Sequence, residues 1–489
     1  MSKPHIIYMV ADQLRYDMLG RGFTPNIDSI AQNGVSINRA YCGCPLCVPS
    51  RGSLFTGTYP NTNGSLINPW HPLDADYGNV QEGMDNLYWV MERGGWDCIH
   101  SGKQHLYTQG GNLETRPDTQ TRWMSTEQTY KTFLKQKGVR MPGGPDFRSP
   151  VPEMVQGRHT RLCTYSNANT GCYEQGLENY FDGYFTDKAL EGLRERDRNK
   201  PLFLSMMFLA PHPPLDVPDP FYSSVRPEDV QLPENVGRWY KYQSPLQMYN
   251  LTGVVGARYS LEQWRETWRA YMGLVSLLDN CVGRVLDELK AQCIYEDCML
   301  IFTTDHGEML GSHKLFQKMC MYEESARAPV YIQFPQRQYA GRVLEQPVSH
   351  IDIQPTLCDY LGIEPLNPMD GTSLLPAIAG GQPVERPVFI QFDGNGARSN
   401  FQRCVIQGRY KLIADIFKDE VYYECYDIYA DPQETNNLLF AQQEPEAAQT
   451  LLDTLVGHMR ATNDLVSLPH TDLRRFVADY QGIPARDGA

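Results

Sequence analysis

The sequence lacks any apolar run of the roughly 18 residues that a membrane-spanning helix needs, and its mean hydropathy is −0.46. Its N-terminal segment also lacks the basic region, the long apolar core and the small-residue cleavage site of a signal peptide. The short apolar run that begins at residue 6 is instead typical of a buried strand. We therefore expect a cytoplasmic protein with no membrane partner, or a periplasmic or secreted protein if a leader has been removed.

Positive charge is also scarce, because 44 Lys and Arg residues face 58 Asp and Glu residues, for a net charge of −14. This balance argues against nucleic acid as a general partner. The 13 cysteines are an odd number without the spacing of a disulfide-rich domain, so we expect mostly reduced thiols. Cys42, Cys44 and Cys47 resemble half of a zinc site, but no matching second pair follows and we disfavour that interpretation.

Apolar runs rich in β-formers recur along the first two thirds of the chain and end in polar motifs. Predicted strands cover residues 6–12, 96–103, 201–212 and 298–307, and predicted helices cover residues 24–34, 84–95, 185–198 and 261–292. Continuous apolar strands that alternate with helices are typical of a sheet buried on both faces. The sequence therefore predicts an α/β fold with a large, mainly parallel sheet flanked by helices. The long helix at 261–292 is predicted to face the core.

The pattern changes after residue 362. Predicted strands at 387–393, 403–416 and 421–428 follow one another directly, before a helix at about 444–463. We expect a catalytic domain over residues 1–370 and a smaller C-terminal subdomain with an antiparallel sheet over residues 371–489. The polar stretches 107–182 and 216–260 are long for connecting loops, and we expect them to shape the substrate pocket or to fill the surface.

Chemically active side chains lie where the predicted parallel strands end. Asp12, Lys103 and His212 each end or directly follow one strand, and Asp305 with His306 ends a fourth. Ligands of open α/β sheets bind at the carboxyl ends of the strands. The sequence therefore predicts that these side chains form one site.

The segment Cys47-Val48-Pro49-Ser50-Arg51, followed by Leu54-Phe55-Thr56-Gly57, resembles the sequence that formylglycine-generating enzymes recognise in type I sulfatases of the alkaline phosphatase superfamily. The resemblance continues in the same order along the chain. It covers residues 6–13, 101–105, 210–214, 303–308, 318 with 321–324, 348–357 and 431–438. It implies an alkaline phosphatase-like fold with a small C-terminal subdomain.

By this resemblance, a maturase converts Cys47 into formylglycine, whose hydrate is the nucleophile. Arg51 would then hold a hydroxyl of the hydrate. The start of a helix at Cys47 would also suit an anion, because backbone N–H groups point outward there. The alternative for Cys47 is a buried structural thiol.

The resemblance further implies a divalent metal held by Asp12, Gln13, Asp305, His306 and modified residue 47. Two carboxylates and an amide oxygen are hard donors, which favours Ca²⁺, with Mg²⁺ or Mn²⁺ as alternatives. His306 departs from the Asn of many arylsulfatases and also suits Mn²⁺ or Zn²⁺. The alternative is a helix-capping Asp305 beside an exposed His306.

Lys103, Lys318 and His212 would bind the sulfate oxygens, with His212 as the general acid and His105 as the general base. These cations would offset the acidic charge of the whole chain. Asn68, near Trp70 and His71, would contact the ester or cap a loop. His313 would line the pocket or brace its loop. His350 and Asp352 are predicted to be structural, with Asp352 capping a helix at residues 353–361.

The predicted function is hydrolysis of a sulfate ester of a small molecule or a glycan. The alternative is a phosphonate monoester or phosphodiester hydrolase of the same superfamily. The segment Gly102-Lys103-Gln104-His105 favours the sulfatase. The phosphonate hydrolases carry hydroxyl side chains at the positions of Lys103 and His105. A non-catalytic, metal-stabilised binding protein is a third hypothesis. The sugar, its linkage and the oligomeric state are left open.

Overall fold

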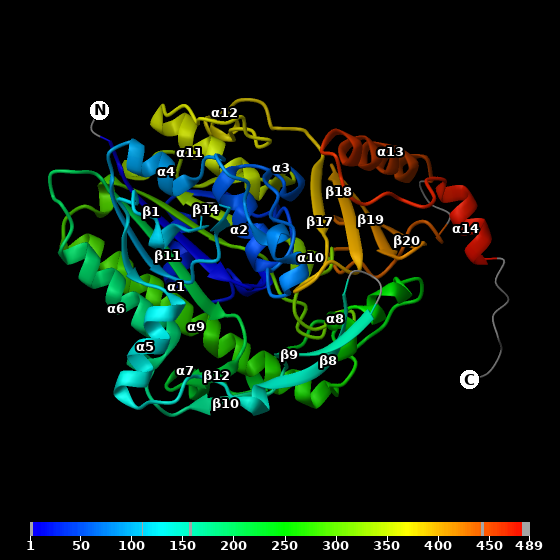
Figure 1. The fold of residues 1–489 in the computed structure, drawn as a ribbon, viewed down its shortest axis with the longest axis horizontal. Coiled ribbons are helices and arrows are strands. Elements are labelled where there is room, and N and C mark those ends of the chain that lie inside the picture. The colour runs from blue at the N-terminus through cyan, green and yellow to red at the C-terminus, as the bar shows by residue number, and fades with distance from the viewer. Residues whose placement is uncertain (1–2, 110, 156–158, 442–444, 482–489) are drawn as a thin grey trace.

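A computed structural model describes residues 3–109, 111–155, 159–441 and 445–481, and a sheet of eight strands lies at its centre (Figure 1). The order across this sheet is β15-β2-β14-β13-β1-β11-β4-β7. The strand bounds are β1 His5–Asp12, β2 Val35–Ile37, β4 Asp97–Gly102, β7 Arg122–Ser125, β11 Leu202–Pro211, β13 Cys298–Thr304, β14 Val330–Gln333 and β15 Arg342–Leu344. Among these pairs, β13–β14 and β14–β2 are antiparallel and the others are parallel, which confirms the predicted α/β class.

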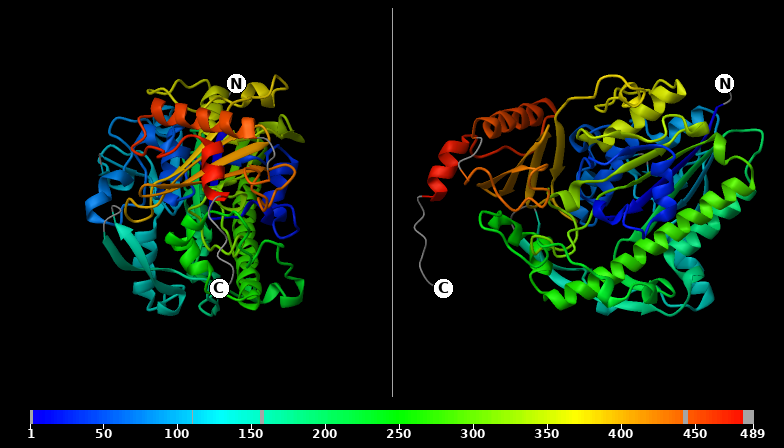
Figure 2. Two further views of the ribbon diagram at one scale, coloured as in Figure 1. Left: turned by 90° about the vertical axis from the view of Figure 1, so that its right-hand side faces the viewer. Right: turned by 180° about the vertical axis from the view of Figure 1, so that it is seen from behind.

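Helices cover both faces of this sheet (Figure 2). Ile7 and Met9 of β1 pack with α1 (Pro25–Gln32), α6 (Phe181–Arg194) and α9 (Leu261–Ala291). The alternate residues Ile6 and Tyr8 pack toward the helices of the other face. Those helices are α2 Cys47–Thr56, α4 Leu87–Arg93, α11 Ile353–Leu361 and α12 Leu375–Ile378. Because both faces of the strand are buried, its sequence is apolar throughout.

The C-terminal subdomain is an antiparallel sheet with a packed helix, as predicted. Its elements are β17 Val388–Phe392, β18 Phe401–Gln407, β19 Tyr410–Phe417, β20 Glu420–Asp427, α13 Pro445–Ala461 and α14 Leu473–Gln481. The predicted strand 403–416 is two strands, because Gly408 turns the chain with φ +58°. Glu444 and residues 482–489 lie outside the described residues. The boundary after residue 370 remains a prediction, and α12 beyond it packs with the large sheet.

Smaller elements connect these layers. They are β3 Ala40–Tyr41 with β16 Val348–Ser349, α3 Pro60–Asn63, β5 Tyr107–Thr108 with β6 Gly111–Asn112, α5 Glu127–Lys137, β8 Arg148–Val155 with β9 His159–Ser166, β10 Thr170–Tyr173 with β12 Leu215–Pro218, α7 Phe221–Ser224, α8 Leu251–Gly256 and α10 Glu323–Ala326. Helix α6 begins at Phe181, earlier than the predicted residue 185. The β8–β9 hairpin runs below the C-terminal sheet in Figure 1.

Buried charges join the two parts of the molecule. Lys411 on β19 lies 2.7 Å from a carboxylate oxygen of Glu323 and 2.7 Å from one of Glu434, and it donates to the carbonyl of Met321 at 3.0 Å. Burial opposes the charge of Lys411, but the two carboxylates raise its pKa well above the usual value. Removing one partner of such a buried group leaves an uncompensated charge. The C-terminal sheet therefore anchors the segment around residues 321–324.

All 13 cysteines are free thiols, in agreement with the expectation of reduced cysteines. Among the described helices, none is long and apolar enough to cross a membrane.

Candidate active site

Four neighbouring strands bring the predicted site residues together at one edge of the large sheet. The strands β13, β1, β11 and β4 lie side by side and parallel. Asp12 ends β1, and Lys103, His212 and Asp305 follow the ends of β4, β11 and β13. The strand ends thus place these side chains in one region, as the sequence pattern indicates.

Cys47 is the first residue of α2 and is 3% exposed. Its Sγ lies 3.3 Å from His306 Nε2 and 3.8 Å from both Asp12 Oδ1 and Lys103 Nζ. Burial would raise the pKa of the Cys47 thiol, but the charges of Lys103, Lys318 and His306 hold it well below its usual value. The start of α2 therefore carries a side chain surrounded by cationic groups.

Asn68 satisfies one of the backbone donors at the start of this helix. Its Oδ1 accepts from the N–H of Val48 at 3.2 Å, and its Nδ2 donates to Asn395 Oδ1 at 3.1 Å. The first N–H groups of a helix have no partner inside the helix. Asn68 thus caps α2 from a distant loop, and it also lines the cavity beside Cys47.

The ligand atoms of Asp12, Cys47, Asp305 and His306 all lie within 4.8 Å of one another. Burial and then the charge of Asp12 raise the pKa of Asp305, because two carboxylates share this space. A divalent cation would relieve that repulsion, and the donors are carboxylates and an imidazole. The residues therefore fit a metal ion. Cys42 and Cys44 do not join this group, and burial raises the pKa of both thiols.

Arg51 bridges the carboxylates of Asp12 and Asp305. Its Nη2 lies 3.1 Å from Asp12 Oδ2, its Nε lies 3.0 Å from Asp305 Oδ2, and its Nη1 donates to the Lys103 carbonyl at 3.1 Å. The side chain is fully buried and does not line the cavity. Its geometry supports a role in orienting the carboxylates. The predicted contact with a hydroxyl of the nucleophile remains a prediction.

Glu308 orients Gln13. The carboxylate of Glu308 accepts from the side-chain amide of Gln13 and from the N–H of Leu310 at 3.0 Å. The amide oxygen of Gln13 is thereby left to accept from the ammonium group of Lys318. In the sequence, Glu308 stands out only as the last residue of the segment 303–308, and its local pattern does not indicate this role.

Gly102 fixes the exit of Lys103 from β4. At φ +117°, a Cβ on Gly102 would lie 1.9 Å from the carbonyl oxygen of Met207, so a side chain is excluded. The N–H of Lys103 then donates to that carbonyl at 2.8 Å. Lys103 Nζ lies 2.6 Å from Asp12 Oδ2. Burial would lower the pKa of Lys103, but the charge of Asp12 raises it.

His105 pairs with Glu127, a residue that no sequence motif indicated. His105 Nε2 lies 3.1 Å from Glu127 Oε2, and Glu127 is the first residue of α5. Burial opposes both charges, but the pair raises the pKa of His105 and lowers that of Glu127 to about 2. The one signal in the sequence was the position of Glu127 inside the polar stretch 107–182.

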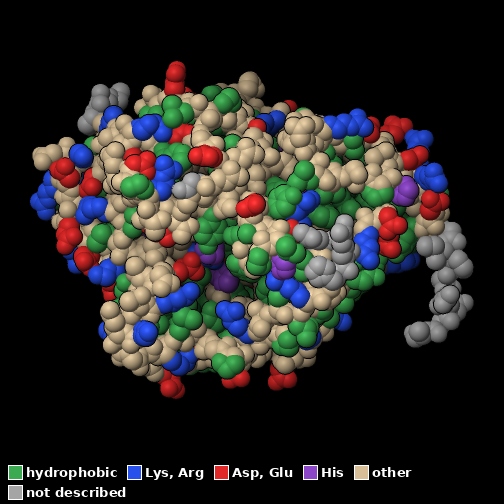
Figure 3. Space-filling view, viewed as in Figure 1, with side chains coloured by type: hydrophobic (Ala, Val, Ile, Leu, Met, Phe, Trp, Pro, Cys, Tyr) green, Lys and Arg blue, Asp and Glu red, His purple; other side chains and the backbone are tan. Residues whose placement is uncertain are grey.

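One cavity of about 620 Å³ is lined by the predicted residues Cys47, Asn68, Lys103, His105, His212 and Lys318. Figure 3, viewed as in Figure 1, shows a hollow in the surface, with His side chains inside it and Lys and Arg side chains along its edge. Burial, then Lys318 and Lys103, lower the pKa of His212 to about 4. Its Nδ1 lies 2.5 Å from the carbonyl oxygen of Pro213.

The two polar stretches differ in their relation to this cavity. Residues from 107–182 line it, including Glu127, Arg148 and Tyr165, as predicted. No described residue of 216–260 lines it, so the first of the two alternatives for that stretch, a part of the substrate pocket, does not hold. These residues instead pack beside α9 and the C-terminal sheet, where Leu246 joins the core of the C-terminal subdomain.

Three other residues that the sequence pattern indicated are structural. His313 stacks on Tyr322 with ring centroids 4.0 Å apart and does not line the cavity, so it braces its loop. His350 Nε2 donates to the Ala328 carbonyl at 3.1 Å and lies 3.1 Å from the hydroxyl oxygen of Thr303, and burial lowers the pKa of His350 to about 4. His71 accepts from the N–H of Leu73 at 3.2 Å.

Asp352 is structural, as predicted, but it does not cap α11. Its own backbone is helical (φ −79°, ψ −16°), which directs the carboxylate away from the first N–H groups of that helix. The carboxylate instead accepts from the N–H groups of Ser349 at 3.0 Å and Thr372 at 2.8 Å, and it pairs with Arg386. The predicted cap is therefore wrong.

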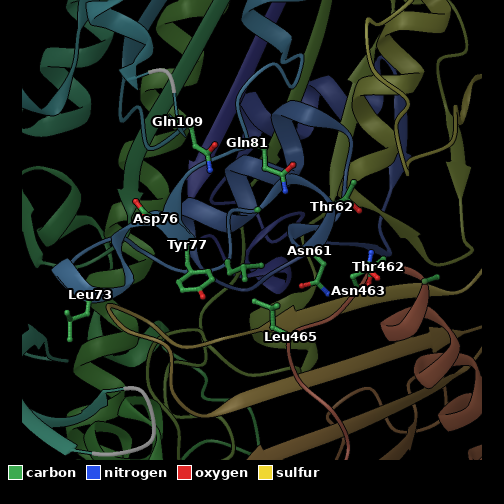
Figure 4. A pocket seen from close by; sticks show the side chains of 13 residues that line it. Asn61, Thr62, Leu73, Asp76, Tyr77, Gln81, Gln109, Thr462, Asn463 and Leu465 are labelled. Atoms are coloured by element: carbon green, nitrogen blue, oxygen red, sulfur yellow. Dashed lines mark hydrogen bonds between the residues drawn. The ribbon is translucent and has the colours of Figure 1, made fainter.

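A larger hollow of about 820 Å³ lies elsewhere, between the loop at residues 61–81 and the end of α13 (Figure 4). Its lining includes the amides Asn61, Gln81, Gln109 and Asn463 but no Lys, Arg, His or Cys. It therefore offers no thiol and no cationic side chain to an anionic ester. The smaller cavity at Cys47 has both.

The fold and this cavity define a hydrolase of the alkaline phosphatase superfamily. The sulfatase family model matches residues 4–363, so the chain belongs to the sulfatase family and is a sulfuric ester hydrolase. A second model, for the C-terminal region of N-sulphoglucosamine sulphohydrolase, matches residues 311–461.

Two relatives match over nearly the whole chain. The multifunctional alkaline phosphatase superfamily protein PehA of Trinickia caryophylli is 26% identical over 543 residues, which cover 100% of both chains. An arylsulfatase of Clostridium perfringens is 25% identical and 98% of each chain is covered.

Two solved structures share the fold. The phosphonate monoester hydrolase of Agrobacterium radiobacter has a TM-score of 0.76 at 23% identity, over 94% of this chain and 96% of that chain. A protein in complex with its substrate D-glucosamine-2-N,6-O-disulfate has a TM-score of 0.68 at 20% identity, over 95% and 99% of the two chains.

Proposed function

We propose that this sulfatase hydrolyses sulfate esters of carbohydrates, with a formylglycine that a maturase forms from Cys47 and with a bound divalent metal. One observation carries the proposal: Cys47 begins α2 within 3.8 Å of Asp12, Lys103 and His306, in a cavity open to a ligand. Membership of the sulfatase family supports the reaction class.

Asp12, Gln13, Asp305 and His306 would hold the metal, together with residue 47. The carboxylates and the amide oxygen favour Ca²⁺, with Mg²⁺ or Mn²⁺ as alternatives. When bound, the ion would neutralise anionic oxygens at the reacting centre. Arg51 and Glu308 would keep the ligands in position, as their hydrogen bonds to Asp12, Asp305 and Gln13 indicate.

The hydrate of formylglycine supplies two hydroxyl groups on one carbon, one to attack sulfur and one whose deprotonation expels the sulfate and restores the aldehyde. His212 would donate a proton to the oxygen of the departing sugar as the S–O bond breaks, because a bound sulfate offsets the charges of Lys318 and Lys103 that lower its pKa in the free protein. His105 would remove the proton from the second hydroxyl. Lys103 and Lys318 would bind the sulfate oxygens and stabilise the charge that develops on them.

Glu127 acts on this chemistry through His105, as a positioning residue. A carboxylate at Nε2 favours the tautomer or charge state with a proton there, which leaves Nδ1 as the atom that can face residue 47. The side chains of His105 and Cys47 interact, which contributes to raising the pKa of His105 and lowering that of the Cys47 thiol. The pair thus supports His105 as the base.

Two observations support a carbohydrate substrate. The cavity of about 620 Å³ exceeds the space that a sulfate group fills, and its wall includes the 52% exposed ring of Trp70. An exposed aromatic ring offers an apolar face with a polar edge, which suits a sugar ring. The neighbour with a disulfated glucosamine as its substrate supports the same class.

The proposal is tested by mass spectrometry of the peptide across residue 47 and by sulfate release from a sulfated sugar. We expect the aldehyde or its hydrate at residue 47, and loss of turnover without unfolding in Cys47→Ala. Cys163→Ala, a change at the mouth of the same cavity, is the matched control and should remain active. Full activity with unmodified cysteine would refute the mechanism.

A phosphonate monoester or phosphodiester hydrolase is the second candidate, because one relative is named multifunctional and one neighbour is a phosphonate hydrolase. Lys103 and His105 beside Cys47 favour sulfate. The kcat/KM values on matched sulfate and phosphonate esters separate the two. A clear preference for the phosphonate ester would favour the phosphonate hydrolase over the sulfatase.

A further inference from the structure

The cavity at Cys47 is cationic although the chain as a whole is acidic. Its lining includes the cations Lys103, Lys131, Arg148, Arg161 and Lys318 but one carboxylate, Glu127. The chain carries a net charge of −14. A local reversal of charge of this kind attracts an anionic ligand.

Three of these cations already have partners. Lys103 pairs with Asp12 at 2.6 Å, Lys318 donates to Gln13, and Arg161 Nε lies 2.7 Å from Glu153 Oε2. Lys103 and Lys318 are also the groups assigned to the transferred sulfate. They account for one anionic group of the substrate.

Arg148 and Lys131 are different. The guanidinium of Arg148 has no hydrogen-bond or ion-pair partner, and the ammonium of Lys131 has no hydrogen bond, within the part of the chain that the structure describes. Lys131 acts on Glu127 only through its charge, in lowering the pKa of that carboxyl. Both side chains are exposed and both line the cavity. They are cations available to a ligand.

The element that carries Arg148 is firmly held. Glu153 on β8 accepts from Arg161, from the hydroxyl of Tyr165 and from the N–H of Gly396 at 3.2 Å. The last contact ties the β8–β9 hairpin to the loop after β17. Trp70 lies against Tyr165, with ring centroids 6.3 Å apart. A side chain on a held element can recognise a ligand at lower entropic cost.

We propose that the substrate carries a second anionic group besides the transferred sulfate, and that Arg148 and Lys131 bind it. This inference rests on the proposed function and names its substrate class: a sugar with two negative charges. The second group is a carboxylate, as on a uronate, or a second sulfate. Arg148 is suited to either, because a guanidinium matches the two oxygens of a carboxylate or a sulfate.

Binding to the Cys47→Ala variant, which cannot turn over, tests the second charge by calorimetry at low salt. One pair of probes is N-acetylglucosamine 6-O-sulfate against glucosamine 2-N,6-O-disulfate. The other is an unsaturated uronate disaccharide 6-O-sulfate against its methyl ester. We expect the doubly charged probe of at least one pair to bind about tenfold more tightly. The pair that shows the preference identifies the second group.

Charge reversal by Arg148→Glu with Lys131→Glu should remove that preference. Lys135→Glu, on the same helix as Lys131 but outside the cavity lining, is the matched control and should retain it. The proposal is overturned if no doubly charged probe binds better than its partner, or if the preference survives the double reversal. If the matured protein releases no sulfate from any ester, the proposed function fails, but this binding comparison still decides the second charge.

Discussion

The inner end of the cavity and its mouth hold their polar groups in different ways. At the inner end, Asp12, Asp305 and Arg51 are fully buried and bound to one another. At the mouth, Arg148 is exposed and Trp70 presents half of its surface to solvent. Groups that are held before the substrate arrives suit chemistry, since they need no rearrangement during the reaction. Groups that gain a partner only from the ligand suit recognition.

The largest effect should come from the inner end. Asp305→Ala removes a buried carboxylate from the metal-capable group and leaves Arg51 with one partner fewer. We expect loss of both bound metal and turnover, checked by elemental analysis of the purified protein beside sulfate release. Asp287→Ala, on the exposed surface of α9, is the control. Retention of metal and rate in Asp305→Ala would contradict the site.

Lys103→Ala and Lys131→Ala compare the inner end of the cavity with its mouth. The first change removes one charged contact whose strength rises in the transition state, and kcat should fall on the order of a hundredfold. Lys131→Ala removes the same charge from the mouth and should raise KM for a doubly charged sugar more than it lowers kcat. Steady-state kinetics of both variants test whether the inner end acts in chemistry and the mouth in recognition. Equal effects on kcat would show that the two regions do not differ in role.

Glu127 lies between the two regions, since its carboxylate contacts His105 and feels the charge of Lys131. Glu127→Gln should lower kcat by about ten- to a hundredfold, a part of what a general base contributes. KM should change little, because the reacting sulfate is bound by other groups. Glu127→Asp should recover part of kcat. A loss confined to KM, with no recovery in the Asp variant, would assign Glu127 to binding instead.

Trp70→Ala should have the smallest effect. Loss of an aromatic contact of about 0.5–1.5 kcal/mol corresponds to a change of a few-fold in affinity. KM for a sulfated sugar should rise by that amount. Melting temperature should remain near the wild-type value, because the ring is 52% exposed. An unchanged KM would remove Trp70 from the sugar-binding wall.

The inner end was largely predictable from sequence and the mouth was not. Asp12, Lys103, His212 and Asp305 follow strands whose apolar runs are plain, and parallel strands end at a common edge. Glu127 follows β7, a four-residue strand too short and too polar to be recognised from the sequence, and Arg148 begins β8 in the same polar stretch. The role of Glu308 depended on a hydrogen bond to Gln13, a contact distant in sequence.

The errors have a common physical cause. Asp352 precedes a helix and is a good capping residue by type, but its helical backbone directs its carboxylate elsewhere. Residues 216–260 have the composition of a binding loop, but tertiary packing takes them away from the cavity. Residue type predicts what a side chain can bind, and long-range packing decides what it meets.

The bridge from Lys411 to Glu323 and Glu434 has a consequence for synthesis of the chain. The anchor of the segment after Lys318 forms late, because Lys411 and Glu434 leave the ribosome after all eight strands of the large sheet. Glu323 has no counter-charge from the C-terminal sheet until then. We expect the site to close last. If the proposed conversion of Cys47 takes place, this order leaves an interval in which the maturase could reach Cys47, a residue almost hidden once folding is complete.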